Sequence, residues 1–206
     1  GHFMRVMPGN SFHPDEPLLL HGKYEIHFPE EGKIIMRSPE SLFHLIRYEY
    51  HLQIKPDSPE LKITNVMVNT APFSRPLGIW SLTRLNPEFL KTVWIPRGKE
   101  EVQNTVKSLA ISRGEQEIRL DFGSSNLPES EYFELRLWSQ QAWIRLLTPQ
   151  GATFRITYSV GKKFQVGPQV HLFLCKKFAE FESHGMVREL SPGESVQFTE
   201  YWNTVP

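Results

Sequence analysis

Apolar and polar residues alternate with a period of two along much of the chain. Apolar residues occupy every second position from Ile46 to Ile54, and polar residues lie between them. This pattern is typical of a strand that buries one face. A turn at 56–60 follows, and the alternation resumes from Leu61 to Asn69. The two segments are therefore predicted to form an antiparallel hairpin.

Shorter segments later in the chain repeat the pattern. They predict strands at 118–122, 133–137, 143–147, 154–158 and 170–173. Turn-rich stretches such as 123–128 and 148–151 separate them. Many short strands at near-regular spacing favour packed antiparallel sheets, so the fold class is all-β.

Helix signals are few. Asn86-Pro87-Glu88 places a cap residue, a proline and an acid at the start of a helix of one or two turns. Ser38-Pro39-Glu40-Ser41 offers a second brief turn before the first long strand. No repeat, low-complexity tract or long linker divides the 206 residues, so a single β-sandwich domain over 1–206 is expected.

Composition narrows the range of partners. Lys+Arg and Asp+Glu number 23 each, the formal net charge is zero and no basic stripe is visible, which argues against nucleic acid. The longest apolar run is too short to cross a bilayer, so a soluble protein without a membrane partner is expected. The compartment stays open between cytoplasm and periplasm. The only cysteine, Cys175, excludes an intrachain disulfide and is interpreted as a small buried hydrophobe.

The strong catalytic motifs are absent from the sequence. There is no phosphate-binding glycine loop, nucleophile elbow, paired-cysteine metal site or helical histidine pair. The chain has eight histidines, several of them in the first 30 residues, but their irregular spacing favours exposed or hydrogen-bonded side chains over a zinc site. Neither a metal nor a cofactor is expected.

Three groups of residues suit a sugar ligand. In His13-Pro14-Asp15-Glu16-Pro17, prolines stiffen a loop whose carboxylates can accept hydrogen bonds from neighbouring hydroxyls, although a solvent-exposed turn explains it as well. Five tryptophans offer faces that stack on sugar C–H groups. Most are expected in the core, but Trp138 is out of phase with Leu135 and Leu137 and is predicted to face away from it. The third group could recognise an acidic sugar or simply mark solvated strand ends; it comprises Arg84, Lys91, Lys176 and Lys177.

The end of the chain carries the most specific pattern. Phe181-Glu182-Ser183-His184-Gly185 predicts a strand with carboxylates, Pro192-Gly193-Glu194-Ser195 a turn, and the segment through Glu200-Tyr201-Trp202 a terminal strand. With this ending, the chain resembles galactose mutarotase-like domains of the aldose-epimerase superfamily, most closely a branch of unassigned function. The likeness extends to Gly1-His2-Phe3-Met4-Arg5, Pro14-Asp15-Glu16-Pro17, Val68-Asn69-Thr70 and the segment 77–83.

The resemblance implies a large antiparallel super-sandwich with a carbohydrate site on the concave face of one sheet. In active members, a glutamate near the C-terminus removes the anomeric hydroxyl proton while a histidine protonates the ring oxygen, which requires no cofactor. By position, Glu182 is the candidate base, with Glu180 as its competitor, and His2 joins Glu182 in the candidate catalytic set. The remaining candidates are substrate contacts: Arg5, His13, Asp15, Trp80, Arg84, Lys177 and Glu180.

Two departures from the family pattern affect these expectations. The strand where active epimerases carry a second histidine reads Gly78-Ile79-Trp80-Ser81, so the usual acid is missing, and His171 or His13 is the substitute. The chain also starts at the Gly-His motif, so the sandwich is expected to be shortened at its N-terminus, with an open edge that a partner chain could cover. Two hypotheses stay open: a mutarotase-like isomerase acting on a sugar or sugar acid, and a non-catalytic carbohydrate-recognition or assembly sandwich.

Overall fold

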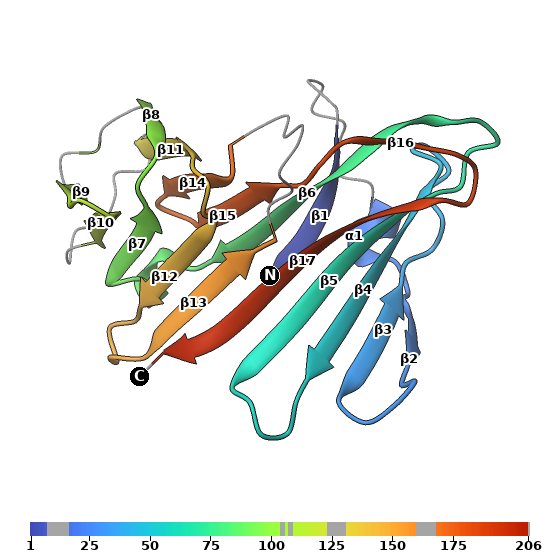
Figure 1. Ribbon diagram of the computed structural model, residues 1–206, viewed down its shortest axis with the longest axis horizontal. Helices are drawn as coiled ribbons and strands as arrows, with labels where there is room; N and C mark the ends of the chain where they lie inside the picture. The colour runs from blue at the N-terminus through green and yellow to red at the C-terminus, as the bar shows by residue number, and fades with distance from the viewer. Residues whose placement is uncertain (8–16, 104–105, 107–108, 123–130, 160–167, 206) are drawn as a thin grey trace.

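The computed structural model describes the chain except for residues 8–16, 104–105, 107–108, 123–130, 160–167 and 206. Its strands form two antiparallel sheets (Figure 1). The seven-stranded sheet has the order β1 (His2–Met7), β6 (Arg75–Leu85), β15 (Ala179–His184), β14 (Val170–Cys175), β11 (Tyr132–Trp138) and β8 (Lys99–Gln103), with β16 (Arg188–Leu190) paired to β6.

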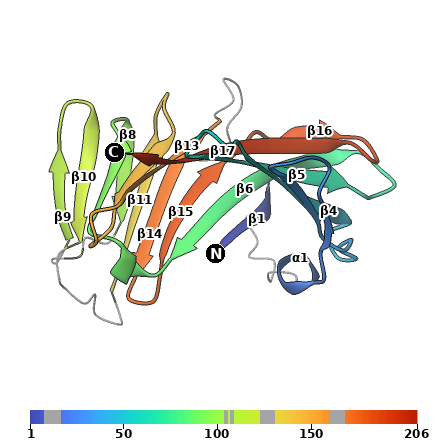
Figure 2. The ribbon, with the colours of Figure 1, turned by 90° about the horizontal axis from the view of Figure 1, so that it is seen from below.

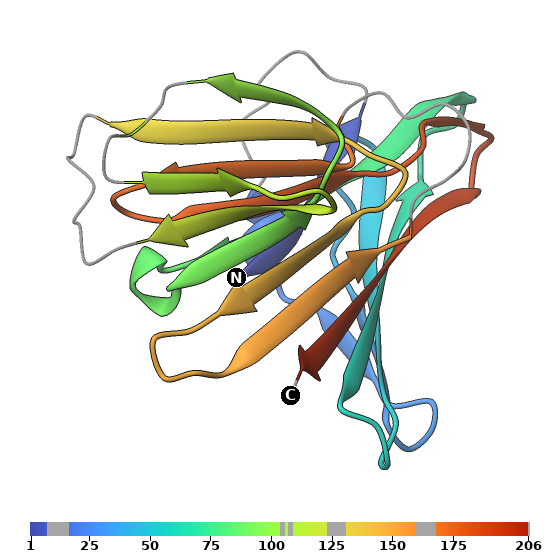
Figure 3. The same ribbon diagram turned by 60° about the vertical axis from the view of Figure 1, so that its left-hand side comes forward.

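The ten-stranded sheet faces the first and curves around it (Figures 2 and 3). Its order is β2 (Glu25–His27), β3 (Lys33–Arg37), β4 (Ile46–Ile54), β5 (Glu60–Asn69), β17 (Ser195–Val205), β13 (Thr153–Tyr158), β12 (Trp143–Leu147), β7 (Thr92–Pro96), β10 (Glu117–Phe122) and β9 (Leu109–Arg113). The all-β antiparallel sandwich expected from the sequence is confirmed.

The core lies between the two sheets, because the inward positions of facing strands are apolar. Phe133, Leu135 and Leu137 of β11 and Phe181 of β15 are fully buried, and Ile118 of β10 is equally buried in the opposite sheet. Burying each such side chain contributes about 1.5–3 kcal/mol. The alternate residues of β11 and β15 must then point away from the core.

The predicted elements are confirmed with small shifts of their ends. β4 and β5 form the expected hairpin, with Ile46 opposite Asn69 and Ile54 opposite Leu61. The strands predicted at 118–122, 133–137, 143–147, 154–158 and 170–173 are β10, β11, β12, β13 and β14. Trp138 follows Glu134 and Arg136 at alternate positions of β11, so it faces away from the core as predicted.

The short helical elements were predicted less well. The predicted cap at Asn86 is present: its Oδ1 accepts a hydrogen bond from the backbone N–H of Glu88, 3.1 Å away, at the start of the 3₁₀ turn η1 (Pro87–Phe89). Ser41 instead forms an isolated bridge with Ile46. The helix α1 (Pro17–His21) was not predicted, and Leu19 anchors it in the core.

Cys175 is half-buried rather than buried, because it lies at the end of β14 on the side away from the core.

None of the described helices is long and apolar enough to span a membrane.

Candidate functional site

Polar and aromatic side chains collect on the face of the seven-stranded sheet that points away from the core, hereafter the outer face. The pairing register determines this arrangement. Glu182 of β15 is directly opposite Leu82 of β6 and His171 of β14, and paired residues share a face. Phe181 and Ser183, on either side of Glu182, point inward.

Glu182 is the most deeply buried carboxylate on the outer face, with 3% of its surface exposed. Its Oε2 accepts a hydrogen bond from Trp80 Nε1, 2.9 Å away, and lies 2.6 Å from His171 Nδ1. Both contacts use the same oxygen, and no described residue donates a hydrogen bond to Oε1. The carboxylate is therefore held in one orientation by one of its two oxygens.

His171 links Glu182 to a second buried carboxylate. Its Nε2 is 2.9 Å from Oε1 of Glu134, and the same oxygen is 2.6 Å from Arg136 Nη2. Burial opposes charge on the imidazole, but the hydrogen bond to Glu182 and the negative charges of Glu182 and Glu134 outweigh burial and the nearby Arg136. The pKa of His171 is therefore raised above its ordinary value. The doubly protonated ring suits this position, since both nitrogens face carboxylates.

His184, two residues after Glu182, has the opposite electrostatic environment. Burial lowers its pKa to about 4; the positive charges of His171 and Arg136 act in the same direction, and Glu182 opposes them. Its ring meets Trp80 edge-on, with 5.2 Å between centroids. The outer face thus carries one histidine that favours the charged form and one that favours the neutral form.

Arginine and aromatic side chains alternate along the β1–β6 side of this face. The Arg5 guanidinium is 5.2 Å from the Trp80 ring centroid and 5.7 Å from that of Phe3. The Arg84 guanidinium is 5.6 Å from the Phe3 ring and 4.2 Å from the Phe178 ring. Such cation–π contacts order the arginines without using their N–H groups.

The structure brings most of the predicted site residues together and separates one. Arg5, Trp80, Arg84 and Glu180 all share the outer face with Glu182. Lys177 is exposed in the turn between β14 and β15. The predicted contacts His13 and Asp15 lie outside the described residues.

His2, predicted to act with Glu182, lies on the opposite side of the sheet. It pairs with Thr83, which in turn pairs with the inward-facing Phe181. His2 Nε2 is 3.1 Å from Asn65 Oδ1, and its Nδ1 is 3.1 Å from Thr83 Oγ1. The two members of the predicted catalytic pair therefore do not meet in the structure.

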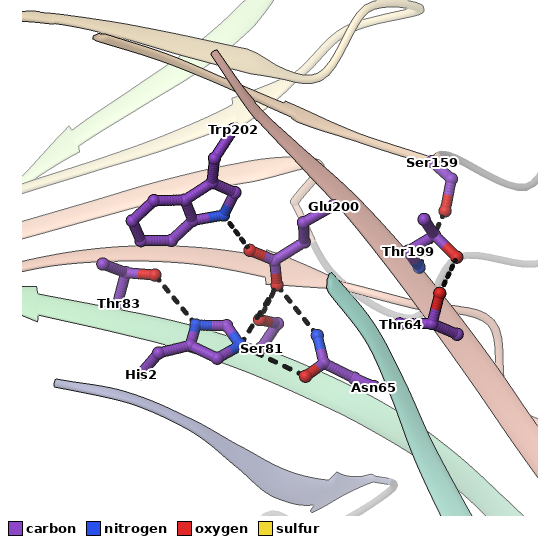
Figure 4. A network of polar contacts seen from close by, with 9 residues as sticks. All are labelled: His2, Thr64, Asn65, Ser81, Thr83, Ser159, Thr199, Glu200 and Trp202. Carbon is purple, nitrogen blue, oxygen red and sulfur yellow. Dashed lines mark hydrogen bonds and ion pairs between the residues drawn. The ribbon is translucent and has the colours of Figure 1, made fainter. Parts of the chain in front are cut away.

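His2 belongs instead to a buried network between the sheets, hereafter the inter-sheet cluster (Figure 4). At its centre is Glu200 of β17, which is 0% exposed. Glu200 accepts hydrogen bonds from Asn65 Nδ2 and Trp202 Nε1, each at 3.0 Å, and from the Ser81 hydroxyl. Because Asn65, Glu200 and Trp202 belong to one sheet and His2 and Ser81 to the other, the cluster ties the sheets together.

Glu134 and Arg136 were missed by the sequence reasoning. Their signal was available: they alternate with Phe133, Leu135 and Leu137 in a strand that was predicted, so they had to lie on its polar face. What the sequence lacked was the pairing of β11 with β14, which sets Arg136 opposite His171. Among the described residues, no group of three His, Cys, Asp or Glu side chains is placed to hold a metal ion.

No family model matches the chain, and no curated protein does. Among solved structures, the chain is similar to part of a TPR-domain containing protein from Parabacteroides distasonis, with a TM-score of 0.63 and 15% identity over 100% of this chain and 37% of that one. It is also similar to a galactose mutarotase-like protein from Lactobacillus casei, with a TM-score of 0.52 and 12% identity over 88% of this chain and 73% of that one.

A third similar structure is the galactose mutarotase related enzyme from Lactobacillus acidophilus, with a TM-score of 0.50 and 9% identity over 89% of this chain and 71% of that one. At these identities the similarity concerns the fold. The chain has a galactose mutarotase-like β-sandwich fold.

Proposed function

We propose that the outer face of the seven-stranded sheet binds a carbohydrate and that Glu182 accepts the proton of the anomeric hydroxyl in a mutarotase-like reaction. The observation that carries the proposal is the state of Glu182: it is 3% exposed, anchored through Oε2 by Trp80 and His171, and receives no hydrogen bond at Oε1 from a described residue. The similar mutarotase-like structures support the same class of ligand.

The anchoring of Glu182 suits general base catalysis. A carboxylate whose orientation is already fixed loses little conformational entropy when a hydroxyl binds to its second oxygen. His171 cannot turn away without leaving Glu134 or Glu182, because each ring nitrogen faces one of them. We therefore assign His171 and Glu134 as positioning residues for Glu182.

A second candidate function is carbohydrate binding without turnover, and one observation favours it. Ring opening needs an acid at the ring oxygen. Both nitrogens of His171 already contact carboxylates, and His2 lies on the other side of the sheet. Of the outer-face histidines in the described part of the chain, this leaves His184, whose pKa, lowered to about 4, leaves it without a proton to donate at neutral pH.

Anomer equilibration separates the two candidates. The rate at which the anomers of a panel of hexoses and uronic acids interconvert is measured by NMR with the wild type and with Glu182→Gln. Glu189→Gln, the same change at an exposed position of β16, is the matched control. Catalysis predicts acceleration over buffer that falls about 100-fold or more in Glu182→Gln and persists in Glu189→Gln. Chemical-shift changes on binding without acceleration would select the binding function. Absence of both effects for every sugar would reject both candidates.

A further inference from the structure

We infer that the outer face holds a second sugar subsite next to Glu182, centred on Glu180, so that the ligand is an oligosaccharide or glycoside rather than a single sugar. The inference rests on the proposed carbohydrate-binding function. Two successive outer-face positions of β15, Glu180 and Glu182, carry carboxylates, and each carboxylate has the same kind of surroundings.

Glu180 repeats the arrangement of Glu182 one step along the strand. The two residues are separated by one inward-facing residue, Phe181, so their Cα atoms lie about 7 Å apart. Glu180 is 7% exposed, and its Oε1 accepts hydrogen bonds from Arg84 Nε, 2.9 Å away, and from Arg84 Nη2. As with Glu182, a donor from β6 occupies one oxygen, and no described residue donates a hydrogen bond to the other.

Aromatic residues lie next to Glu180, just as Trp80 lies next to Glu182. Phe173 is directly opposite Glu180 on β14. The Phe173 ring centroid is 5.8 Å from that of Phe178 and 5.5 Å from that of Tyr132, and 39% of Tyr132 is exposed. The three rings form a continuous series over the turn end of β15, β14 and β11. Aromatic surface of this kind packs against the apolar C–H faces of sugars.

The dimensions favour a ligand of more than one ring. Glu182 and Phe178 are four residues apart on one side of an extended segment, which places them about 13 Å apart. A single pyranose cannot contact both, whereas two linked rings can. The first ring would meet Glu182 and Trp80, and the second would meet Glu180 and the three aromatic rings.

Beside Glu180 and Glu134, the charge pairing favours hydroxyl groups of a sugar over acidic groups. Arg84 is paired with Glu180, and Arg136 is paired with Glu134. Neither arginine therefore provides an uncompensated positive charge for a carboxylate or phosphate group. The carboxylate oxygens that receive no hydrogen bond from a described residue would instead accept hydrogen bonds from hydroxyls.

The inference predicts that affinity rises with chain length. The test is calorimetric titration with two series of sugars: glucose, cellobiose and cellotriose, and galactose and β-1,4-galactobiose. In at least one series, the affinity should rise about tenfold or more from one ring to two. It should change little from two rings to three. Phe178→Leu and Glu180→Gln should remove the gain in affinity from the second ring. Phe178→Tyr, which keeps the aromatic face, should retain the gain.

Phe28→Leu is the matched control, because Phe28 is 72% exposed and lies in the ten-stranded sheet's β2–β3 loop, away from this face. Thermal melting confirms that each variant is folded. If one ring binds as tightly as two, or if Phe28→Leu matches Phe178→Leu, the second subsite is wrong while the proposed function stands. If no sugar of any length binds, the proposed function fails and the subsite fails with it.

Discussion

Two glutamates define two regions of this molecule, and their surroundings share the same residue types. Glu182 on the outer face and Glu200 in the inter-sheet cluster each accept a hydrogen bond from a tryptophan indole N–H. Each also has a histidine neighbour: His171 Nδ1 is 2.6 Å from Glu182, and His2 Nε2 is 3.7 Å from Glu200. The difference lies in how completely the protein satisfies each carboxylate.

Among the described residues, Glu200 has hydrogen-bond donors for both of its oxygens and Glu182 for only one. Both oxygens of Glu200 accept hydrogen bonds, and the residue has no exposed surface. The described residues use only one oxygen of Glu182. A carboxylate whose hydrogen-bonding capacity is filled from within the fold contributes to structure, whereas one with an oxygen in reserve can act on a ligand. The comparison therefore favours a structural role for Glu200 and supports the ligand role proposed for Glu182.

The largest expected effect is on stability and comes from Glu200→Ala. The substitution leaves the buried amide N–H of Asn65 and the indole N–H of the half-buried Trp202 without their acceptor, which costs about 3–5 kcal/mol of unfolding free energy. Glu182→Ala should cost less, because the groups that it leaves, on Trp80 and His171, belong to half-buried residues, whereas Asn65 is fully buried. Urea unfolding of both variants measures the difference.

Glu189→Ala, at an exposed position, provides the baseline for loss of a glutamate side chain. Equal destabilisation by Glu200→Ala and Glu182→Ala would remove the distinction between the two regions. A Glu200→Ala variant that does not fold would agree with the expectation only if Glu182→Ala folds under the same conditions.

The sequence predicted the architecture better than it predicted the partners within each region. Strand alternation depends on neighbouring residues, so β4, β5 and β11 could be predicted from local pattern. The same alternation placed Glu180 and Glu182 together on one face, since they are two residues apart. Pairing His2 with Glu182 required the register of β1 on β6 and of β6 on β15, and a shift of one residue moves a side chain to the other face.

Local pattern also could not reveal which strands distant in the chain pair with each other. Asn65 and Glu200 are 135 positions apart in the chain, and their hydrogen bond depends on β5 and β17 being neighbours. The helix α1 was missed for a related reason. Its five residues are too few to show a helical period, and Leu19 docks them in the core.

The two outer-face histidines should give opposite pH dependences of stability. The pKa of folded His171 is raised above the ordinary value of 6.5, so its stabilising contribution is complete below pH 6.5 and is lost as pH rises through the folded pKa. The pKa of folded His184 is lowered from 6.5 to about 4, so protonation favours the unfolded chain as pH falls from 6.5 towards 4.

Unfolding free energies measured from pH 4 to pH 9 test this expectation. His171→Gln should lose the dependence above pH 6.5, and His184→Gln should lose part of the dependence below it. NMR titration of the two imidazoles identifies the groups directly. Burial and the positive charges of His171 and Arg136 lower the pKa of His184, and Glu182 opposes them. The pKa of His171 is raised because Glu182 and Glu134 outweigh burial and Arg136. A His171 pKa below 6.5 would therefore show that the contacts of His171 with Glu134 and Glu182 are not formed in solution.

The smallest effect is expected at Tyr158, which lies between the two regions. Its side chain is buried, and burial followed by the charges of Glu200 and Glu182 holds the pKa of the phenol well above its ordinary value. In the described part of the chain, its hydroxyl has no hydrogen-bond partner. Tyr158→Phe removes an unsatisfied polar group and should leave the unfolding free energy unchanged or raise it by up to about 1 kcal/mol. Thermal melting of Tyr158→Phe measures the change in stability. A loss of more than about 1 kcal/mol of unfolding free energy would show that the Tyr158 hydroxyl forms a hydrogen bond, which would link the inter-sheet cluster to the sheet that carries Glu182.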